Sequence, residues 1–165
     1  MIELATVNQM TVSEFMASYG DVAEHSPWVA KAAAALRPFV NREAMIEAFA
    51  STVAAAQVSA QLALIRAHPD LASKAKLTSD SSREQEGAGL DALTTTEFAH
   101  FTGLNNRYKQ RFGFPFIYAV KGATKSQIIQ SFEERVENEQ DEEFAMALRQ
   151  VCRIFRFRIE DRVSP

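Results

Sequence analysis

Apolar residues recur every three or four positions along most of the chain, which is the spacing of an amphipathic α-helix. Each periodic stretch is bounded by polar residues, glycine or proline, so the helices can be delimited from the pattern alone. The pattern predicts helices over residues 11–20, 26–36, 41–67, 94–113, 126–138 and 141–163.

Polar residues mark where several of these helices begin. Residues 11–14 and 94–97 have the Thr-x-x-Glu spacing of a capping box, in which two side chains and two backbone amides satisfy one another. Ser26 precedes a proline and is expected to be an N-cap, as is Asn41. These signals favour a chain of helices over any arrangement of strands.

The periodicity weakens over residues 69–93. Residues 71–75 predict about one helical turn, and residues 81–84 form another capping-box pattern with Ser81 as the expected N-cap. Residues 114–120, Phe-Pro-Phe-Ile-Tyr-Ala-Val, are too short and too aromatic for a helix, so we expect an extended segment there.

The composition agrees with a helical fold. The 165 residues include 26 alanines but only six glycines and five prolines, whereas a sandwich or barrel needs a turn signal about every ten residues. The sequence contains no repeat or linker. The predicted fold is therefore all-α, a compact helical bundle in which residues 1–165 form a single domain, with a short extended segment near 114–120.

Charge and cysteine content exclude several kinds of function. A formal net charge of −3 argues against binding nucleic acid or an anionic membrane. One cysteine cannot form an intramolecular disulfide or a cysteine-based zinc cluster. The chain has no apolar run long enough to cross a membrane, no signal-peptide pattern at its start and no peroxisomal signal at its end, so we expect a cytoplasmic protein.

His68 is the first candidate for chemistry. It stands in an Ala-His-Pro-Asp sequence where the proline must end a helix, which leaves the imidazole at a helix terminus. An imidazole titrates near neutral pH and can give or take a proton. The alternative is a histidine that only complements the helix dipole.

Two further segments combine structural and chemical signals. Residues 81–85, Ser-Ser-Arg-Glu-Gln, fit a capping box, but a helix N-terminus also suits an anionic or urea-like ligand. An extended strip at 114–120 without a sheet partner has backbone groups that a planar, amide-rich ligand would satisfy, although its aromatic residues also fit a core. In the last predicted helix, Cys152 is expected to fill space in the core, and at least one of the arginines Arg153, Arg156, Arg158 and Arg162 is expected to face inward towards an anion.

Together these segments resemble one enzyme family, the 2-oxo-4-hydroxy-4-carboxy-5-ureidoimidazoline (OHCU) decarboxylases. The resemblance extends from about Thr11 to Val163, and the order and spacing of its motifs make it specific. The residues that carry it are Leu-Ile-Arg-Ala-His-Pro-Asp-Leu-Ala at 64–72, Leu77-Thr78, Ser81-x-x-Glu84-Gln85, and Asn105-x-x-Tyr108-x-x-Arg111-Phe-Gly-Phe-Pro-Phe-Ile117.

The resemblance implies an all-helical, dimeric enzyme that converts OHCU to S-allantoin in purine catabolism without a metal or organic cofactor. The family's catalytic acid corresponds to His68 and its partner acid to Glu84. The resemblance also implies substrate contacts for Pro69, Ser81, Ser82, Arg83, Glu84, Gln85, Phe116, Ile117, Tyr118, Ala119, Val120 and Arg158. Arg158 is the best match to an arginine near the C-terminus of the family, but other arginines close to it in the sequence could fill the same role.

Two other functions remain open at this point. The chain could be a helical interaction module without activity, with the aromatic strip as a partner groove. It could also be a metal hydrolase built on His68, Asp70 and Glu84, although imidazoles at ligand spacing are too few for a typical site.

Overall fold

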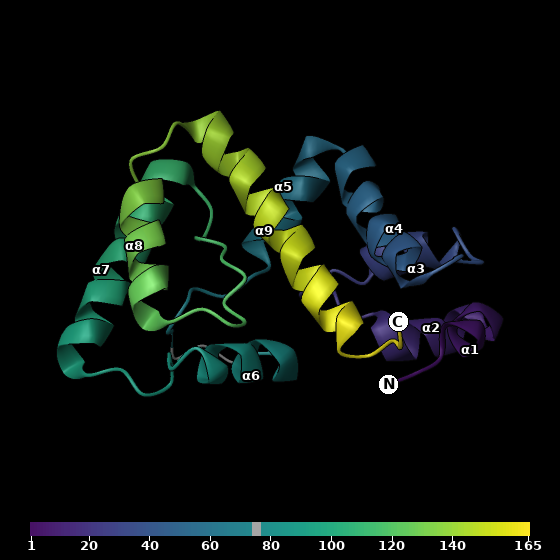
Figure 1. The fold of residues 1–165 in the computed structure, drawn as a ribbon. Coiled ribbons are helices and arrows are strands. Elements are labelled where there is room, and N and C mark those ends of the chain that lie inside the picture. Colours follow the sequence, from purple (N-terminus) through teal and green to yellow (C-terminus); the bar gives the residue numbers. More distant parts are fainter. Residues whose placement is uncertain (74–76) are drawn as a thin grey trace. The chain divides into compact units, whose positions relative to one another are not determined.

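A computed structural model of the chain describes residues 1–73 and 77–165, and within these ranges it contains nine α-helices (Figure 1). They are α1 (Leu4–Gln9), α2 (Val12–Tyr19), α3 (Trp28–Ala34), α4 (Arg42–Ala55), α5 (Val58–Arg66), α6 (Ser79–Gly87), α7 (Thr95–Phe112), α8 (Lys125–Arg135) and α9 (Gln140–Glu160). In the same ranges the only β-pairing is a parallel bridge between Ile2 and Val163. The predicted all-α class is confirmed.

Three of the N-caps predicted from the sequence are confirmed. Thr11 and Thr94 are the N-caps of α2 and α7, and both make the predicted capping box. Asn41 caps α4 by accepting a hydrogen bond from the Ala44 N–H at 2.7 Å. The helix α8 begins one residue earlier than predicted, because Thr124 makes a further capping box, and it ends at Arg135.

Other boundaries differ from the sequence prediction. Ser26 is not an N-cap, because its hydroxyl donates to the Glu24 carbonyl (2.9 Å) and α3 begins at Trp28. The stretch 41–67 is two helices, α4 and α5, bent by 116° at the two residues between them. The helix α1 was not predicted, because six residues are too few to establish a helical period.

The contacts of the chain group into two compact units. The first contains Met1–Ala67 and Val151–Pro165, and its buried aromatic residues meet around Phe15 and Phe49. Phe155 of α9 packs edge-on against Phe49, with ring centres 5.9 Å apart. The two chain ends meet in this unit at the bridge described above (Figure 1).

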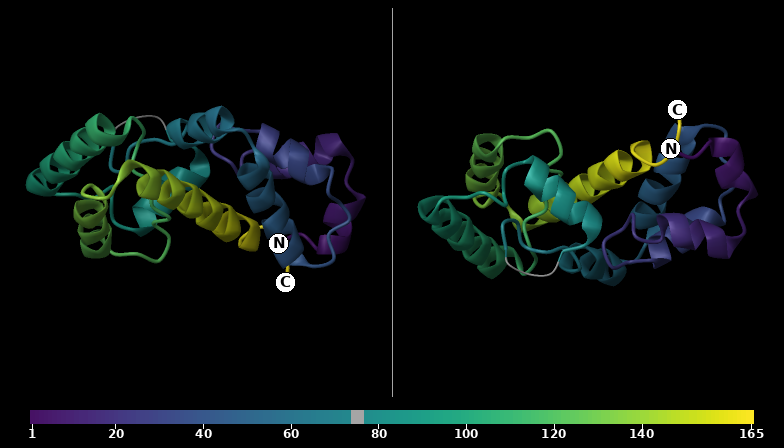
Figure 2. Two further views of the ribbon diagram at one scale, coloured as in Figure 1. Left: turned by 90° about the horizontal axis from the view of Figure 1, so that it is seen from above. Right: turned by 90° about the horizontal axis from the view of Figure 1, so that it is seen from below.

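The second unit contains His68–Gln150, in which α7 and α8 lie side by side, as both views in Figure 2 show. Its core is a second aromatic cluster centred on Tyr108. Phe116 stacks on Phe132 of α8 with ring centres 3.8 Å apart, and Tyr108 meets both rings edge-on. This stacking attaches the segment after α7 to the helices beside it.

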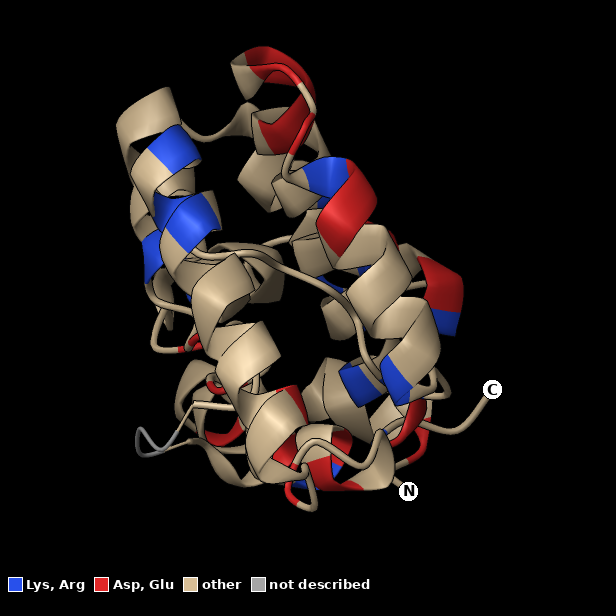
Figure 3. Cartoon of the chain, turned by 90° about the vertical axis from the view of Figure 1, so that its left-hand side faces the viewer, with Lys and Arg blue, Asp and Glu red and all other residues tan. Residues whose placement is uncertain are grey.

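The surface carries charges of both signs, interspersed along the helices (Figure 3). Among the described residues, no single helix is long and apolar enough to cross a membrane; only α4 and α5 taken together reach the required length and hydropathy. These two are separate helices with a sharp bend between them.

Candidate active site

All but one of the predicted site residues lie in the unit of residues 68–150. They come from three segments of this unit: the loop that begins at His68, the helix α6, and residues 116–120. Arg158 belongs to the other unit and is described with its own surroundings below.

His68 and Pro69 lie in the loop of residues 67–73 that follows α5. The helix α5 ends at Arg66, so the predicted stop before the proline is confirmed. The side chain of His68 is buried, with 8% of its surface exposed. Because proline restricts the backbone of its predecessor as well as its own, this loop fixes the backbone at His68 more tightly than an ordinary turn does.

The loop turns at Leu71 and Ala72, and the peptide group between them is held at both ends. The Ala72 N–H donates to Oε1 of Gln85 on α6 (3.0 Å), and Nδ2 of Asn105 on α7 donates to the Leu71 carbonyl (2.9 Å). Ala72 has φ = 58°, a left-handed conformation that costs a residue with a Cβ about 1 kcal/mol. The two hydrogen bonds stabilise this turn. Of the predicted turn at 71–75, residues 74 and 75 lie outside the described residues.

The N-cap of the helix α6 lies three residues before the predicted one. This N-cap is Thr78, whose hydroxyl accepts a hydrogen bond from the Ser81 N–H (3.3 Å), so the prediction of Ser81 as the cap is wrong. Thr78 is itself a good capping residue with an extended backbone, and it precedes the Ser-x-x-Glu motif. Ser81 and Glu84 are therefore inside the helix.

This shift gives the residues of the 81–85 motif different surroundings. Ser81 and Gln85, four residues apart on one face of α6, are buried, and Glu84 is half-buried. Ser82 and Arg83 are exposed, and Arg83 forms an ion pair with Asp80 (2.5 Å). The buried face of α6 therefore carries the amide of Gln85, and the carboxylate of Glu84 lies at its edge.

Residues 115–120 form neither helix nor strand, in agreement with the predicted extended segment. Phe116, Ile117, Ala119 and Val120 are buried, and Tyr118 is half-buried. The Ala119 N–H donates to Oε1 of Gln150 (3.0 Å), and the Ile117 carbonyl accepts from Nη1 of Arg135 (2.7 Å). These two backbone groups find partners within the protein, so neither depends on a ligand for a hydrogen bond.

A buried ion pair supports this strip. Nε of Arg135 lies 2.5 Å from Oε1 of Glu143, and the guanidinium lies over the Phe116 ring at 4.2 Å from its centre. The Tyr108 hydroxyl donates to the same carboxylate oxygen (2.6 Å), and Asn138 donates to the other (3.1 Å). Burial raises the pKa of Tyr108 well above its usual value, and the adjacent carboxylate raises it further.

Four polar residues of this unit were not identified as functional from the sequence. They are Asn105, Arg135, Glu143 and Gln150. Asn105 is within the motif that carries the family resemblance, but no role could be read from it. The others stand at ordinary polar positions of periodic helices, and the partners that link them to the strip or to Tyr108 are between 8 and 35 residues away in the sequence. Only the folded arrangement connects them to the strip.

Arg158 is the buried arginine of α9, with 3% of its surface exposed. Its Nη1 donates to the Glu24 carboxylate (3.0 Å) and to the Val22 carbonyl (3.1 Å). Arg156 pairs with Glu43 and Glu160, and Arg162 with Asp21, at more exposed positions. The prediction that at least one of these arginines faces inward is confirmed, and the anion it meets is a carboxylate of the chain itself.

Cys152 has the character of a packing residue. It is half-buried, and burial together with the charge of Glu47 raises its pKa to about 11, so the thiol is protonated at neutral pH. Over residues 1–73 and 77–165, no three His, Cys, Asp or Glu side chains are grouped as a metal ion requires. The metal-hydrolase alternative therefore has no ligand set in that part of the chain.

The fold and these side chains define a class of protein: an all-helical domain whose candidate site residues are a buried histidine and polar side chains of α6. Residues 8–160 match the sequence profile of the family described as OHCU decarboxylase. The chain belongs to this family.

Similar proteins cover nearly the whole chain. The OHCU decarboxylase of Halalkalicoccus jeotgali is 40% identical over 159 residues, which are 96% of this chain and 90% of that protein. The enzyme of the same name from Haloferax volcanii is 38% identical and covers 99% and 97%, respectively. The uric acid degradation bifunctional protein PucL of Bacillus subtilis is 42% identical, and the chain spans 33% of its length.

Two solved structures share the fold. A crystal structure of (S)-allantoin synthase has a TM-score of 0.79 and 27% identity, and the match covers 98% of this chain and 54% of that one. A crystal structure of OHCU decarboxylase in the presence of (S)-allantoin has a TM-score of 0.73 and covers 87% of this chain and 96% of that one. Its sequence identity is 22%, so this second likeness concerns the fold alone.

Proposed function

We propose that this chain decarboxylates OHCU to (S)-allantoin, the last step from urate to allantoin, without a metal or organic cofactor. The observation that carries the proposal is the family match over residues 8–160. The relatives named OHCU decarboxylase, which align over nearly their full length, support the same activity. The buried histidine in a restrained loop supports a site built for proton transfer.

The structure of the substrate explains why protein side chains are sufficient for this decarboxylation. Its carboxylate is attached to a carbon next to a ring C=N bond. When the carbon–carboxylate bond breaks and CO2 leaves, the electron pair moves into that C=N system and gives an enol-like intermediate. The neighbouring carbon, which carries the ureido group, then accepts a proton, and the hydroxyl loses its proton to become a ring carbonyl. The electron sink that other decarboxylases take from a cofactor is therefore part of the substrate. The enzyme has to hold the ring in the reactive orientation and deliver one proton to one face.

In our proposal, His68 delivers this proton, or first takes the hydroxyl proton of the substrate and returns it. Glu84 orients the imidazole and accepts hydrogen bonds from the ureido group. Their burial supports these roles, because a half-buried carboxylate and a buried imidazole exchange protons with substrate better than with bulk water. Positioned acid catalysis of this kind contributes about 10² to 10⁴-fold, or roughly 3–5 kcal/mol.

The remaining residues bind the substrate in this proposal. Pro69 and Ser81 to Gln85 line the site, and residues 116–120 contact the flat ring. The strip suits this role because it is buried and its backbone is held by Arg135 and Gln150, which gives it a defined shape before substrate arrives. Arg158 binds an anionic or carbonyl oxygen, and its bond to Glu24 holds the guanidinium in one orientation.

We also propose that residues 1–165 act as a single catalytic domain, that the protein is a homodimer, and that it works in the cytoplasm. The family profile supports the first point, because it extends across both compact units. The dimer and the location follow from the family resemblance. Sedimentation equilibrium of the purified chain tests the dimer directly.

The function is tested by adding the protein to freshly generated OHCU and following circular dichroism. We expect rapid appearance of one allantoin enantiomer, against slow racemic decay without enzyme. Racemic decay at the same rate with and without the protein would refute the proposed function. After treatment with a metal chelator, the protein is expected to keep its full activity. Loss of activity after this treatment would contradict a cofactor-independent reaction.

A further inference from the structure

One peptide group, between Leu71 and Ala72, is held by two different helices. Its carbonyl accepts from Asn105 of α7 at 2.9 Å, and its N–H donates to Gln85 of α6 at 3.0 Å. We infer that Asn105 is a positioning residue for His68, acting through this peptide group. The inference rests on the proposed function, in which His68 carries the proton.

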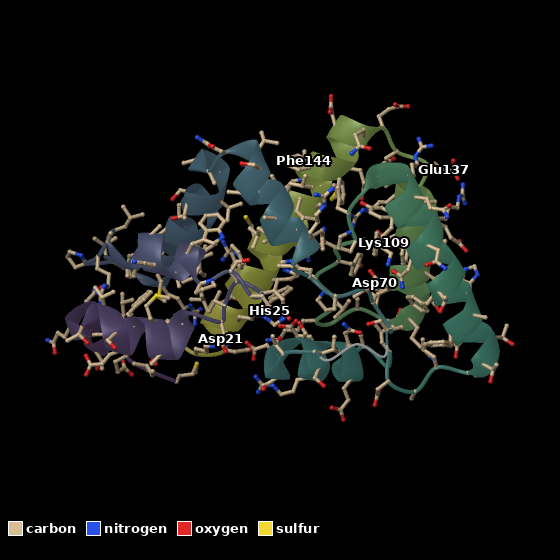
Figure 4. The ribbon with its side chains drawn as sticks, turned by 180° about the vertical axis from the view of Figure 1, so that it is seen from behind. Asp21, His25, Asp70, Lys109, Glu137 and Phe144 are labelled. Atoms are coloured by element: carbon tan, nitrogen blue, oxygen red, sulfur yellow. The ribbon has the colours of Figure 1, made fainter. Side chains whose placement is uncertain are left out.

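The loop has few torsions left with which His68 could move. The Pro69 ring fixes its own φ angle and restricts the backbone of His68. Asp70 is tied to α7 by an ion pair with Lys109, with 2.6 Å between Oδ2 and Nζ, and Figure 4 shows these two side chains close to each other. Leu71 follows Asp70, and its carbonyl is the one that Asn105 holds. Asn105 and Lys109 are one helical turn apart, so α7 restrains the loop at two points.

The same contacts determine the orientation of both amide side chains. A carbonyl can only accept, so Asn105 must present its nitrogen to Leu71. An N–H can only donate, so Gln85 must present its oxygen to Ala72. The amide nitrogen of Gln85 is therefore the end available for substrate, and it donates to a carbonyl or anionic oxygen. Asn105 thus acts on the proton donor through the loop and on Gln85 through the shared peptide group.

Asn105 is poorly suited to a purely structural role. It is buried, with 6% of its surface exposed, and its Oδ1 has no hydrogen-bond partner among the residues that the structure describes. A buried acceptor without a partner destabilises a fold relative to an apolar side chain of the same size. The arrangement is explained if the amide is present for its N–H group, which the loop uses.

Two variants of Asn105 test the inference, with a matched control on the same helix. Asn105→Asp keeps the shape but removes the donor, and Asn105→Leu removes the donor together with the unpartnered oxygen. The control is Asn106→Asp, which adds the same charge to α7 at an exposed position. Each protein is assayed with OHCU for kcat, KM and the enantiomeric excess of allantoin, and its melting temperature is recorded.

We expect both Asn105 variants to lose about 10² in kcat, as a misplacement of about 1 Å costs, with a smaller change in KM and a lower enantiomeric excess. The control should match the wild type in all three. Folded Asn105→Leu protein with wild-type kcat and enantiomeric excess would overturn the inference. Failure of both variants to fold would also reject it, because Asn105 would then serve the fold. An inactive wild-type protein would instead refute the proposed function.

Discussion

Each of the two compact units contains a buried Arg–Glu pair, and the two pairs are built differently. In the unit of residues 68–150, Glu143 accepts hydrogen bonds from Arg135 and from two further side chains. In the other unit, Arg158 donates to Glu24 and to a backbone carbonyl. Both pairs are almost fully removed from solvent, so each is costly to break.

The difference indicates what each pair does. Arg135 uses one N–H group on the carbonyl of Ile117, and the rest of its network is made by side chains of the same unit, so it holds the strip 116–120 in shape. In our proposal, Arg158 is the substrate-contacting arginine that the family resemblance implies, and its bond to Glu24 holds the guanidinium in one orientation. The same residue types thus serve as scaffold in one place and, in our proposal, as a binding group in the other.

Substitution of the arginine in each pair is expected to separate the two pairs most clearly by its effect on kcat/KM. Arg158→Lys keeps a cation beside Glu24 but loses the planar fork, so we expect kcat/KM to fall about 10²-fold while the protein stays folded. Arg135→Lys loses the hydrogen bond to the Ile117 carbonyl, and we expect it to lower the free energy of unfolding by about 2 kcal/mol. Urea unfolding and steady-state kinetics of both variants check this. A larger loss of kcat/KM in Arg135→Lys than in Arg158→Lys would reverse the assignment.

The next comparison concerns stability alone and uses two buried tyrosines, one in each unit. Tyr108→Phe removes a hydrogen bond to the Glu143 carboxylate and should lower the free energy of unfolding by about 1.5–3 kcal/mol. Tyr19→Phe is the matched control, because the Tyr19 hydroxyl is buried and has no partner in the part of the chain that the structure describes. Its removal should be neutral or slightly stabilising. Equal destabilisation by both substitutions in urea would contradict the role given to the Glu143 network.

The smallest expected effect is a pH dependence at the two capping boxes. The Thr94 N–H and, next, Lys125 lower the pKa of Glu97 below its ordinary 4.5, and the Thr11 N–H lowers that of Glu14. The folded state therefore stabilises the ionised form of each carboxylate more than the unfolded state does. This contribution to the free energy of unfolding is present above about pH 4.5 and is lost as the pH falls through the lowered pKa of the folded state.

Glu97→Gln keeps the capping acceptor but cannot titrate. Thermal unfolding of this variant should therefore depend less on pH than that of the wild type between roughly pH 5 and 3. Glu14→Gln should change the profile in the same direction but less, because only Glu97 also has a lysine partner. A steeper acid dependence in Glu97→Gln would mean that the sign of the pKa shift is wrong.

Particular residues show which helix boundaries could be predicted from the sequence alone. The capping boxes at Thr11 and Thr94 were predictable because their signals are local and span four residues. Ser81 was wrongly predicted as the N-cap because Thr78, another residue type that caps helices, precedes it by three residues. The stop before Pro69 was predictable because proline acts on its neighbours directly. Local signals therefore located most of the helices.

The hydrogen bonds that hold the candidate site in place could not be predicted from the sequence in this way. Asn105 holds a carbonyl 34 residues away, and Tyr108 donates to a carboxylate 35 residues away. A single sequence shows such residues as polar or aromatic positions of a helix and does not show their partners. His68 and the segment 81–85 could be selected as candidates from the sequence itself, but the catalytic roles of His68 and Glu84 came from the family resemblance, which does not explain how these side chains are held in place.

The central claim is that His68, held in a restrained loop, delivers the proton that sets the configuration of allantoin. The most direct test compares wild-type protein with His68→Asn on freshly generated OHCU, following circular dichroism at matched concentrations of folded protein. We predict that the variant loses about 10² to 10⁴ in kcat and yields allantoin without enantiomeric excess. Wild-type turnover with wild-type enantiomeric excess in His68→Asn would contradict the account.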